Sequence, residues 1–332
     1  MRILAIAALA WILATGAVVA ADNFDQLAEG AATARRANRI EEAVALYRQA
    51  VQVNPAWLEG WWFLGTLSYS SYHYADCEAA FRTFVKLDPN RELAWGLAGL
   101  CEFETGNYDA ALAHLERSLA SDGALPPEVD AGARFHYGLL LTNAGRFEQA
   151  RRQLGRFAQE CDSQPQVRMG IGLNALHRAS LPGKVPPEGQ ELVSRAGAAM
   201  CEWILQGAEK AGEALGALAH DYPKAPGVHY FYGTYLTTLR PSDARAEFQR
   251  ELEIDPQNAG AAAMLALSLG KAGDAADALS SAIARLETAE RLDPAALQYH
   301  VALAGAYSRA GRYSDARRER LAALELATGH AD

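Results

Sequence analysis

The sequence has little cysteine, no excess of positive charge and almost no long apolar run. Its 332 residues include four cysteines, which are too few for a small domain held together by disulfides. The formal net charge is −9, so the chain lacks the basic surface by which proteins attract nucleic acid or anionic membranes. After residue 21, no segment approaches the roughly 18 uncharged apolar residues of a membrane-spanning helix. We therefore expect no nucleic-acid partner and no membrane insertion of the mature chain.

Sequence motifs of enzymes are also missing. The chain has no phosphate-binding loop, no Gly-x-Ser-x-Gly elbow, no His-Glu-x-x-His and no Cys-x-x-Cys. Its histidines never share an i, i+3 or i+4 helical face, so none forms a local metal site. Residues 170–175 formally fit a dinucleotide-binding fingerprint, but the preceding residues predict a helix instead of the required strand. We interpret these glycines as sites of close helix packing, and we predict a protein that is not an enzyme and has no cofactor and no metal.

The one strongly apolar segment lies at the start of the chain. The positively charged Arg2 is followed by an apolar run over 3–13 and then by small residues up to Ala21. This order is typical of a secretory signal peptide. We predict a signal peptide at 1–20, cleavage before Ala21 or Asp22, and export to the periplasm or the extracellular space. The alternative is an uncleaved anchor, because the apolar length is nearly that of a membrane span.

Two kinds of turn signal recur along the rest of the chain. Asn-Pro or Asp-Pro dipeptides occur at 54–55, 88–89, 255–256 and 293–294. Between them, a glycine separates two amphipathic segments at Gly106, Gly145, Gly273 and Gly311. Proline disfavours helical geometry in the residue before it, and glycine accepts the left-handed conformation that ends many helices. The spacing therefore predicts a series of helix hairpins.

Small residues recur twelve positions apart, where the two helices of each hairpin must approach closely. The pairs are Gly65 and Cys77, Gly99 and Ala111, Gly138 and Ala150, Ala199 and Ala211, and Ala304 and Ala316. Large apolar residues follow four positions later, at Phe81, Leu115, Leu154 and Leu215. With Trp61 and Trp95, which we expect in the core, this pattern resembles the tetratricopeptide repeat (TPR) family, whose 34-residue unit reads Trp-x2-Leu-Gly-x2-Tyr…Ala-x3-Phe…Pro. The resemblance covers nearly all of 24–328 and implies an all-α fold, a TPR-type α-solenoid in which helix pairs form a right-handed superhelix.

The predicted array is interrupted in the middle. We place repeats 1–4 at 24–160 and repeats 5–8, with a C-terminal cap, at 191–328. Between them, 161–190 is an interruption near the centre of the chain. Its residues 163–179 read as an unpaired helix, and 180–190 read as a proline-punctuated loop.

Two local departures refine this register. In repeat six, residues 240–243 replace the usual glycine, so its turn is one residue short. In the last helix, the charged run 317–320 predicts a polar outer face, because nothing stacks on a terminal repeat. We expect the acidic residues in general, including Glu148 and Glu253, on solvated outer faces.

Export would place the four cysteines in an oxidising compartment. In a TPR stack, the helices that carry Cys77 and Cys101 are neighbours, so these two cysteines are a candidate disulfide pair. The alternative is that Cys77 only fills the small buried position of the repeat. Cys161 and Cys201 flank the interruption and form a second candidate pair.

In a TPR stack, the first helix of each pair lines a concave groove. In our register, the side chains facing this groove include many rings: Trp62, Phe63, Tyr69, Phe103, Phe135, His136, Trp203, Tyr230 and Phe231. Exposed rings in such number suit the binding of a peptide or a partner helix. The alternative is that some of them pack between adjacent helices. Arg35 and Arg36 are candidates for contact with a partner carboxylate.

These observations predict an exported, non-catalytic scaffold or adaptor that binds a protein or peptide partner in its concave groove. Adaptor function is what the TPR resemblance implies. The alternative is a structural subunit of an envelope assembly, which would use its convex face or the loop 180–190 for contact.

Overall fold

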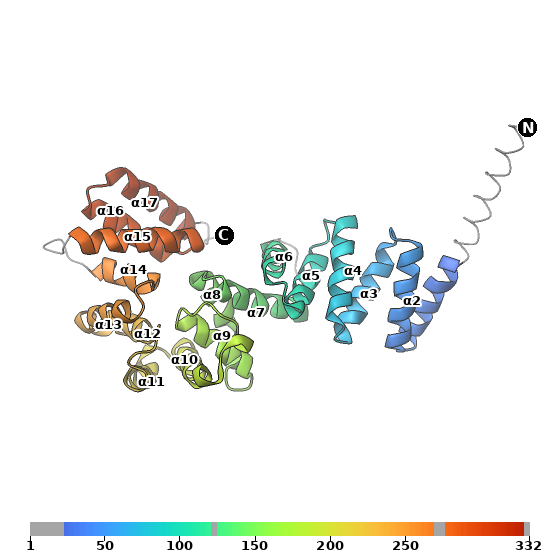
Figure 1. Cartoon of the computed structure of the whole chain (residues 1–332), viewed down its shortest axis with the longest axis horizontal. Coiled ribbons are helices and arrows are strands. Elements are labelled where there is room, and N and C mark those ends of the chain that lie inside the picture. The colour runs from blue at the N-terminus through green and yellow to red at the C-terminus, as the bar shows by residue number, and fades with distance from the viewer. Residues whose placement is uncertain (1–22, 121–124, 269–275, 329–332) are drawn as a thin grey trace, which may run out of the picture. The chain divides into compact units, whose positions relative to one another are not determined.

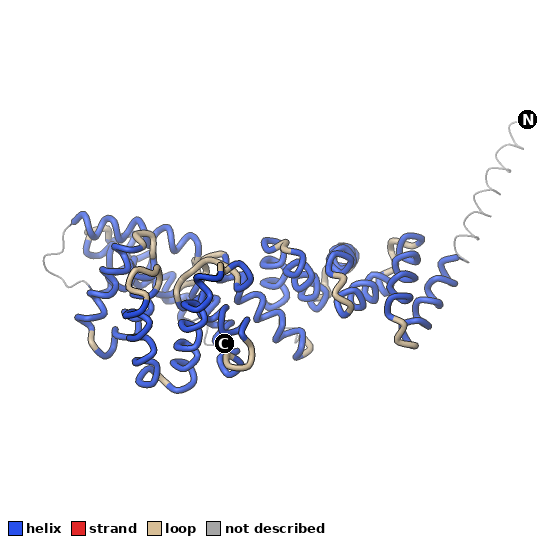
Figure 2. The backbone as a smooth tube through the Cα atoms, turned by 60° about the horizontal axis from the view of Figure 1, so that its bottom comes forward, coloured by secondary structure: helices blue, strands red, loops and turns tan. Residues whose placement is uncertain are grey.

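The computed structural model describes residues 23–120, 125–268 and 276–328. In these ranges all regular structure is helical and no residue lies in a strand (Figure 2). None of the helices described there is both long and apolar enough to cross a membrane. The predicted signal peptide, 1–20, lies outside the described residues.

The chain divides into two compact units, Met1–His136 and Tyr137–Asp332. The first unit consists of consecutive helix pairs (Figure 1). A helix over 23–36 is followed by α2 (Ile40–Val53), α3 (Leu58–Ser70), α4 (Tyr74–Leu87), α5 (Glu92–Thr105) and α6 (Tyr108–Ala120). Helix α7 (Pro127–Asn143) begins in this unit and continues into the second.

The second unit continues the same construction. Its elements are α8 (Phe147–Leu154), η1 (Gly155–Glu160), α9 (Pro165–Ala175), η2 (Pro182–Lys184), α10 (Pro187–Gln206), α11 (Ala208–Asp221), α12 (Val228–Leu239), α13 (Pro241–Ile254), α14 (Ala259–Ser268), α15 (Ala276–Leu292), α16 (Leu297–Arg309) and α17 (Tyr313–Thr328). The all-α prediction is therefore confirmed.

Glycine turns end the first helix of several pairs, as the sequence predicted. Gly106, Gly145 and Gly311 have φ angles of 82°, 76° and 73°, the left-handed region that glycine enters without a Cβ clash. Gly273 lies outside the described residues. These turns reverse the chain within two or three residues and so set each second helix against the first.

The twelve-residue pattern marks the places where paired helices meet. A Cβ on Gly65 would lie 2.6 Å from the Phe81 ring, and one on Gly99 would lie 2.7 Å from Leu115 Cγ. Each large residue follows its glycine by sixteen positions. In repeat six the interval from Gly233 to Phe248 is fifteen, because the turn between α12 and α13 is the single residue Arg240.

The interruption is more closely packed than the sequence indicated. Helix α9 is not unpaired: a Cβ on Gly172 would lie 2.0 Å from Val193 O of α10, and one on Gly197 would lie 2.0 Å from Arg168 O. This glycine contact confirms the packing interpretation of 170–175. Helix α10 begins at Pro187, so the loop is shorter than expected. Burying two backbones this closely requires residues without side chains on both helices.

The outer face of the last pair is not uniformly polar, contrary to our expectation. Leu321 and Leu324 of α17 are 51% and 58% exposed, whereas Glu319 of the same helix is buried against His300 of α16. The charged run 317–320 therefore supplies only part of the surface that solvent meets.

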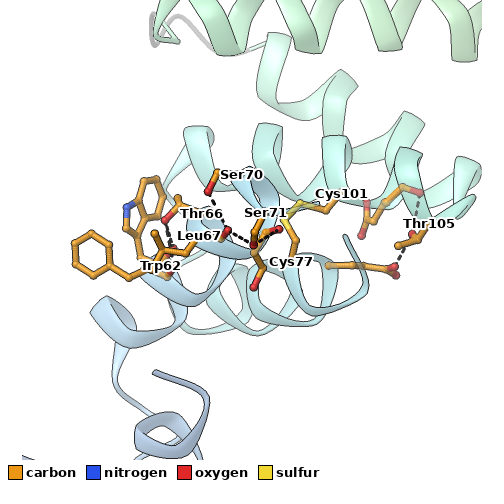
Figure 3. The surroundings of a disulfide bond; sticks show 12 residues. Trp62, Thr66, Leu67, Ser70, Ser71, Cys77, Cys101 and Thr105 are labelled. Atoms are coloured by element: carbon orange, nitrogen blue, oxygen red, sulfur yellow. Dashed lines mark hydrogen bonds between the residues drawn. A yellow bond between two sulfur atoms is a disulfide. The ribbon is translucent and has the colours of Figure 1, made fainter. Parts of the chain in front are cut away.

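Two disulfides link neighbouring helices. Cys77 of α4 is bonded to Cys101 of α5, with 5.8 Å between their Cα atoms (Figure 3). Cys161, at the end of η1, is bonded to Cys201 of α10. Cys77 is also fully buried, so it fills the small position of the repeat and forms the bond as well.

Candidate functional site

The second unit contains a cavity of about 440 Å³. Its walls come from α8, the end of α9, α10, α12 and the start of α16. The lining residues are Phe147, Glu148, Arg151, Asn174, Ala175, His177, Met200, Trp203, Ile204, Tyr230, Phe231, Thr234 and Gln298. We call this cavity the aromatic pocket, because five of these side chains carry rings.

Three rings form a continuous stack on one wall of the aromatic pocket. Phe147 and His177 are parallel, with centroids 4.4 Å apart, and His177 and Tyr230 have centroids 4.1 Å apart. His177 follows α9 with a φ of 50°, a left-handed conformation that histidine adopts more readily than most residues. The contact needs space on α14, since a Cβ on Gly260 would lie 2.7 Å from both the His177 and Tyr230 rings.

Two titratable groups of this stack are uncharged near neutral pH. Burial, with a smaller contribution from the nearby Arg151 charge, lowers the pKa of His177 to about 3. Burial also raises the pKa of Tyr230 above its usual value. The stack therefore presents neutral ring faces and edges to the cavity.

The charges of the aromatic pocket are an ion pair one helical turn apart on α8. Arg151 donates hydrogen bonds to both carboxylate oxygens of Glu148. Glu148 is not on a solvated outer face, as we had expected, because only 18% of its side chain is exposed and it lines the cavity. The two charges neutralise each other, so this pair gives the pocket no net charge.

A buried carboxylate joins the end of the unit back to its beginning. Asp293, in the turn between α15 and α16, accepts a hydrogen bond from Gln149 Nε2 at 2.7 Å and one from Glu148 N at 3.3 Å. Asp293 and Gln149 are 144 residues apart in the sequence. We call these hydrogen bonds between Asp293 and residues 148–149 the Asp293 clasp. They hold the start of α16 against α8, and Gln298 of α16 therefore lies in the pocket wall.

Gln298 contributes a partly buried amide to the pocket wall. Its Nε2 atom is inaccessible to solvent. Its side chain interacts with the hydroxyl of the neighbouring Tyr299 and so opposes the burial that raises the pKa of that group. Gln298 is therefore part of the pocket wall and does not present a donor to the cavity.

The wall opposite the stack is apolar and partly open. Trp203 of α10 lies nearly parallel to Phe231, with 6.1 Å between ring centroids, and contacts Tyr235 edge-on at 5.9 Å. Met200, about one turn earlier on α10, and Ile204, the residue after Trp203, extend this surface. Ile204 is 45% exposed, so the wall continues outward to solvent.

Three residues of the predicted groove lie in the aromatic pocket: Trp203, Tyr230 and Phe231. Trp203 is partly exposed. Tyr230 and Phe231 are 7% and 1% exposed, so the expectation that they stand free in an open groove is wrong. The Tyr230 ring packs against Phe248, the Phe231 ring packs against Trp203, and both residues line the pocket.

The other six predicted groove residues lie in the first unit and are all partly buried: Trp62, Phe63, Tyr69, Phe103, Phe135 and His136. They contact rings of their own or neighbouring helices. Trp62 packs against Phe81 and Phe84, and Tyr69 contacts Tyr74. Much of their surface is therefore used in packing, which was the alternative reading.

His136 joins two of these rings. Its centroid is 4.4 Å from that of Phe103 and 5.5 Å from that of Phe135. Its Nδ1 atom lies 2.7 Å from Gly132 O. Burial lowers the pKa of His136, so this ring is also kept neutral.

The arginines near the first turn, Arg35 and Arg36, both have contacts within the chain, and their role with a partner carboxylate stays a prediction. Arg35 lies over the Phe63 ring at 3.8 Å and donates to Tyr47 Oη at 3.2 Å. Arg36 already pairs with Glu29 at 2.9 Å. The first guanidinium thus supports aromatic packing, and the second has a carboxylate partner within the chain.

The sequence analysis missed a set of buried carboxylates. Glu102, Glu247, Glu251, Asp293 and Glu319 are all buried, although we expected acidic residues on outer faces. Each has a partner. Glu251 accepts from Gly227 N at 2.7 Å and Tyr230 N at 3.2 Å, and so it holds the start of α12 beside the pocket.

A repeated spacing could have revealed part of this network. Trp61 and Trp95 are partly buried, and each donates its indole N–H to the carbonyl of the proline six residues earlier, Pro55 or Pro89. His229 and His300 occupy the same position after Pro223 and Pro294, and their Nε2 atoms lie 2.9 Å from those carbonyls. The histidines therefore replace the tryptophan of the repeat.

The described residues include no group of three or more His, Cys, Asp or Glu side chains arranged to hold a metal ion. In the aromatic pocket, the arrangement of rings and one neutralised ion pair is suited to binding. The described side chains lining it include no serine or cysteine, and the hydroxyl of Thr234 donates to Tyr230 O at 2.9 Å.

Comparison with known proteins agrees with the repeat pattern. A family model described as tetratricopeptide repeat matches residues 64–126 and 102–165. No curated protein matches the sequence. Among solved structures, the chain is similar to the MamA protein, with 16% identity over 61% of this chain and 94% of that one and a TM-score of 0.38.

Two further solved structures are similar to the chain at comparably low sequence identity. A tetratricopeptide repeat protein from Parabacteroides merdae has 13% identity over 75% of this chain and all of its own, with a TM-score of 0.36. Yeast Tom70 has 12% identity over 91% of this chain and 92% of its own, with a TM-score of 0.30. The tetratricopeptide repeat match covers 64–165, and the described helices of the chain form the consecutive pairs of a TPR-type α-solenoid.

Proposed function

We propose that this protein is a non-catalytic scaffold that binds a protein or peptide partner, and that the aromatic pocket of the second unit is the main contact. Tetratricopeptide repeats support a role in protein–protein interaction. The observation that carries the proposal is the partly exposed wall of Trp203 and Ile204 leading into a cavity of about 440 Å³. Aromatic side chains in such pockets commonly contribute most of the binding energy of an interface.

We further propose that the protein acts outside the cytoplasm. The charged and apolar residues of 1–20 support a signal peptide. The two disulfides support an oxidising compartment, because the cytosol keeps most thiols reduced. N-terminal sequencing of the natural protein tests this proposal, and an intact Met1 in a cytosolic fraction would contradict it.

The structure gives less support to the assembly alternative through the loop 180–190. Leu181, Pro182 and Val185 of that loop are buried within the unit. Their apolar surface is therefore already used for packing. This part of the chain serves to hold α9 and α10 together more than to present a contact surface.

The proposal is tested by partner capture. Wild-type protein and the variant Trp203→Ala are compared by affinity purification from the envelope fraction, with Glu253→Gln as a control on an exposed position. We expect Trp203→Ala to lose the partner, because truncating an interface anchor costs about 2 kcal/mol or more. We expect Glu253→Gln to retain it. Equal capture by all three proteins would move the contact away from the aromatic pocket.

A further inference from the structure

We infer that the aromatic pocket takes one uncharged aromatic side chain, presented by a segment of the partner. This inference rests on the proposed function and adds the chemistry of the group that is bound.

The size of the cavity accommodates one aromatic side chain and part of the segment that carries it. About 440 Å³ lies near the lower end of the roughly 300–1,000 Å³ found for small-molecule pockets. The cavity has walls from five separate elements and is partly open beside Ile204, so a side chain that projects from a partner can enter there.

The electrostatics of the pocket favour a neutral occupant. Glu148 and Arg151 already neutralise each other, and His177 and Tyr230 are both uncharged at neutral pH. The two charges of this pair already satisfy each other, so a charged occupant would lose its hydration without gaining a dedicated partner, which makes its burial unfavourable.

The walls favour an aromatic group over an aliphatic one. Trp203 and Phe231 form one wall, and the stack of Phe147, His177 and Tyr230 forms another. Aromatic pairs contribute beyond the area that they bury, through edge-to-face and offset contacts. The thioether of Met200 also makes favourable contacts with rings.

Calorimetric titration with small probes tests the inference. The probes are N-acetyl-tryptophanamide, N-acetyl-leucinamide, and two charged analogues, N-acetyl-tryptophan with a free carboxylate and tryptamine. We expect the neutral aromatic amide to bind with a Kd of about 0.1–1 mM, a range usual for ligands of this size. The leucine amide should bind several-fold more weakly, and both charged analogues at least tenfold more weakly.

One variant and one control assign the binding to the pocket. Trp203→Ala should weaken the neutral probe at least tenfold. Trp62→Ala, a partly buried tryptophan of the first unit, should leave binding unchanged. Circular dichroism melts of each variant establish that it is folded.

The possible results separate the chemistry from the proposed function. Equal affinity for charged and neutral probes, or no binding of the neutral aromatic amide, would overturn the inference. If that occurs while Trp203→Ala still abolishes partner capture, the scaffold proposal stands and only the ligand chemistry is wrong. If the probe binds but Trp203→Ala retains the partner, the pocket binds aromatic groups and the scaffold contact lies elsewhere.

Discussion

His300 Nδ1 lies 2.8 Å from Glu319 Oε2 in a buried pair that joins α16 to α17. The other ring nitrogen, Nε2, lies 2.9 Å from Pro294 O, which can only accept a hydrogen bond. Nε2 therefore carries a hydrogen, and a second proton must lie between Nδ1 and the carboxylate for that contact to be attractive. His229, Glu247 and Pro223 repeat this arrangement in α12 and α13.

Substitutions at Glu319 test this assignment of donors and acceptors. A glutamine can donate its amide N–H to an unprotonated Nδ1, so Glu319→Gln should keep both ring bonds. It loses the pairing with the exposed Arg318 and exchanges the charge-assisted contact with His300 for a neutral hydrogen bond, so its cost should be smaller than that of removing the group. Glu319→Ala leaves a buried ring nitrogen unpaired and should cost about 1–3 kcal/mol. Urea unfolding measures both; equal losses would contradict the assignment.

Two glycine-to-alanine substitutions should change the stability of the protein in opposite directions, because one glycine lies at a close contact between paired helices and the other does not. Gly99→Ala places a Cβ 2.7 Å from the buried Leu115, so it should destabilise the protein by about 1–3 kcal/mol. In Gly305→Ala the nearest atom outside the helix backbone is the end of Arg309, 4.0 Å away. That variant should gain about 0.5–1 kcal/mol through helix propensity. Thermal melts that shift in the same direction for both would refute this account.

The helix pairs and their close contacts could be predicted because each depends on a local signal. A glycine such as Gly106 ends a helix whatever surrounds it, and the interval from Gly65 to Phe81 is fixed by the geometry of one hairpin. The tetratricopeptide spacing places both residues in the same phase along the chain. Neighbouring helices in such an array then bring Cys77 to Cys101.

The aromatic pocket could be predicted only in part. Trp203 and Tyr230 were found because their repeat positions face the first-helix side of the array. His177 and Gln298 were not, because their place depends on a packed interruption and on the Asp293 clasp across 144 residues. Glu148 was assigned to the wrong face, since a helical period alone does not show that another part of the chain covers it.

His177 gives the second unit a definite pH dependence. Its pKa is about 3 in the folded protein and near 6.5 in an unfolded chain. Between these values the unfolded chain takes up a proton that the folded protein does not, so stability falls as pH decreases from 6.5 towards 3. His177→Phe keeps a ring in the stack and cannot titrate, and we expect it to lose this part of the dependence. Urea unfolding at pH 4 and pH 7 compares the two proteins. The prediction fails if the difference in unfolding free energy between them is the same at both values.

Changes of pH between 5 and 8 should leave ligand binding in the aromatic pocket unaffected. His177 is neutral above about pH 4, and the raised pKa of Tyr230 keeps its hydroxyl protonated. Titrating the neutral probe N-acetyl-tryptophanamide at pH 5, 6.5 and 8 should therefore give one affinity within about twofold. A sharp change near pH 6.5 would mean that a histidine titrates in the occupied pocket.

The buried Asp293 should give the unfolding free energy a pH dependence opposite in sign to that of His177. Burial raises the pKa of Asp293, although its hydrogen bonds from Gln149 and from the Glu148 amide oppose the shift. Between the usual value of 3.8 and the raised one, the folded protein holds a proton that the unfolded chain has lost. The contribution of Asp293 to stability therefore decreases as pH rises through this window. Asp293→Asn removes the titration but also one acceptor.

Comparison of wild type with Asp293→Asn isolates this group, because His177 and every other titrating residue is common to both proteins. The free energy of unfolding of wild type minus that of the variant should be larger near pH 4 than at pH 7, measured in urea. A constant difference would mean that burial does not raise the pKa of this carboxyl. A larger difference at pH 7 would mean that the ionised form is the one that the clasp stabilises, since Gln149 and the Glu148 amide would then outweigh the loss of hydration.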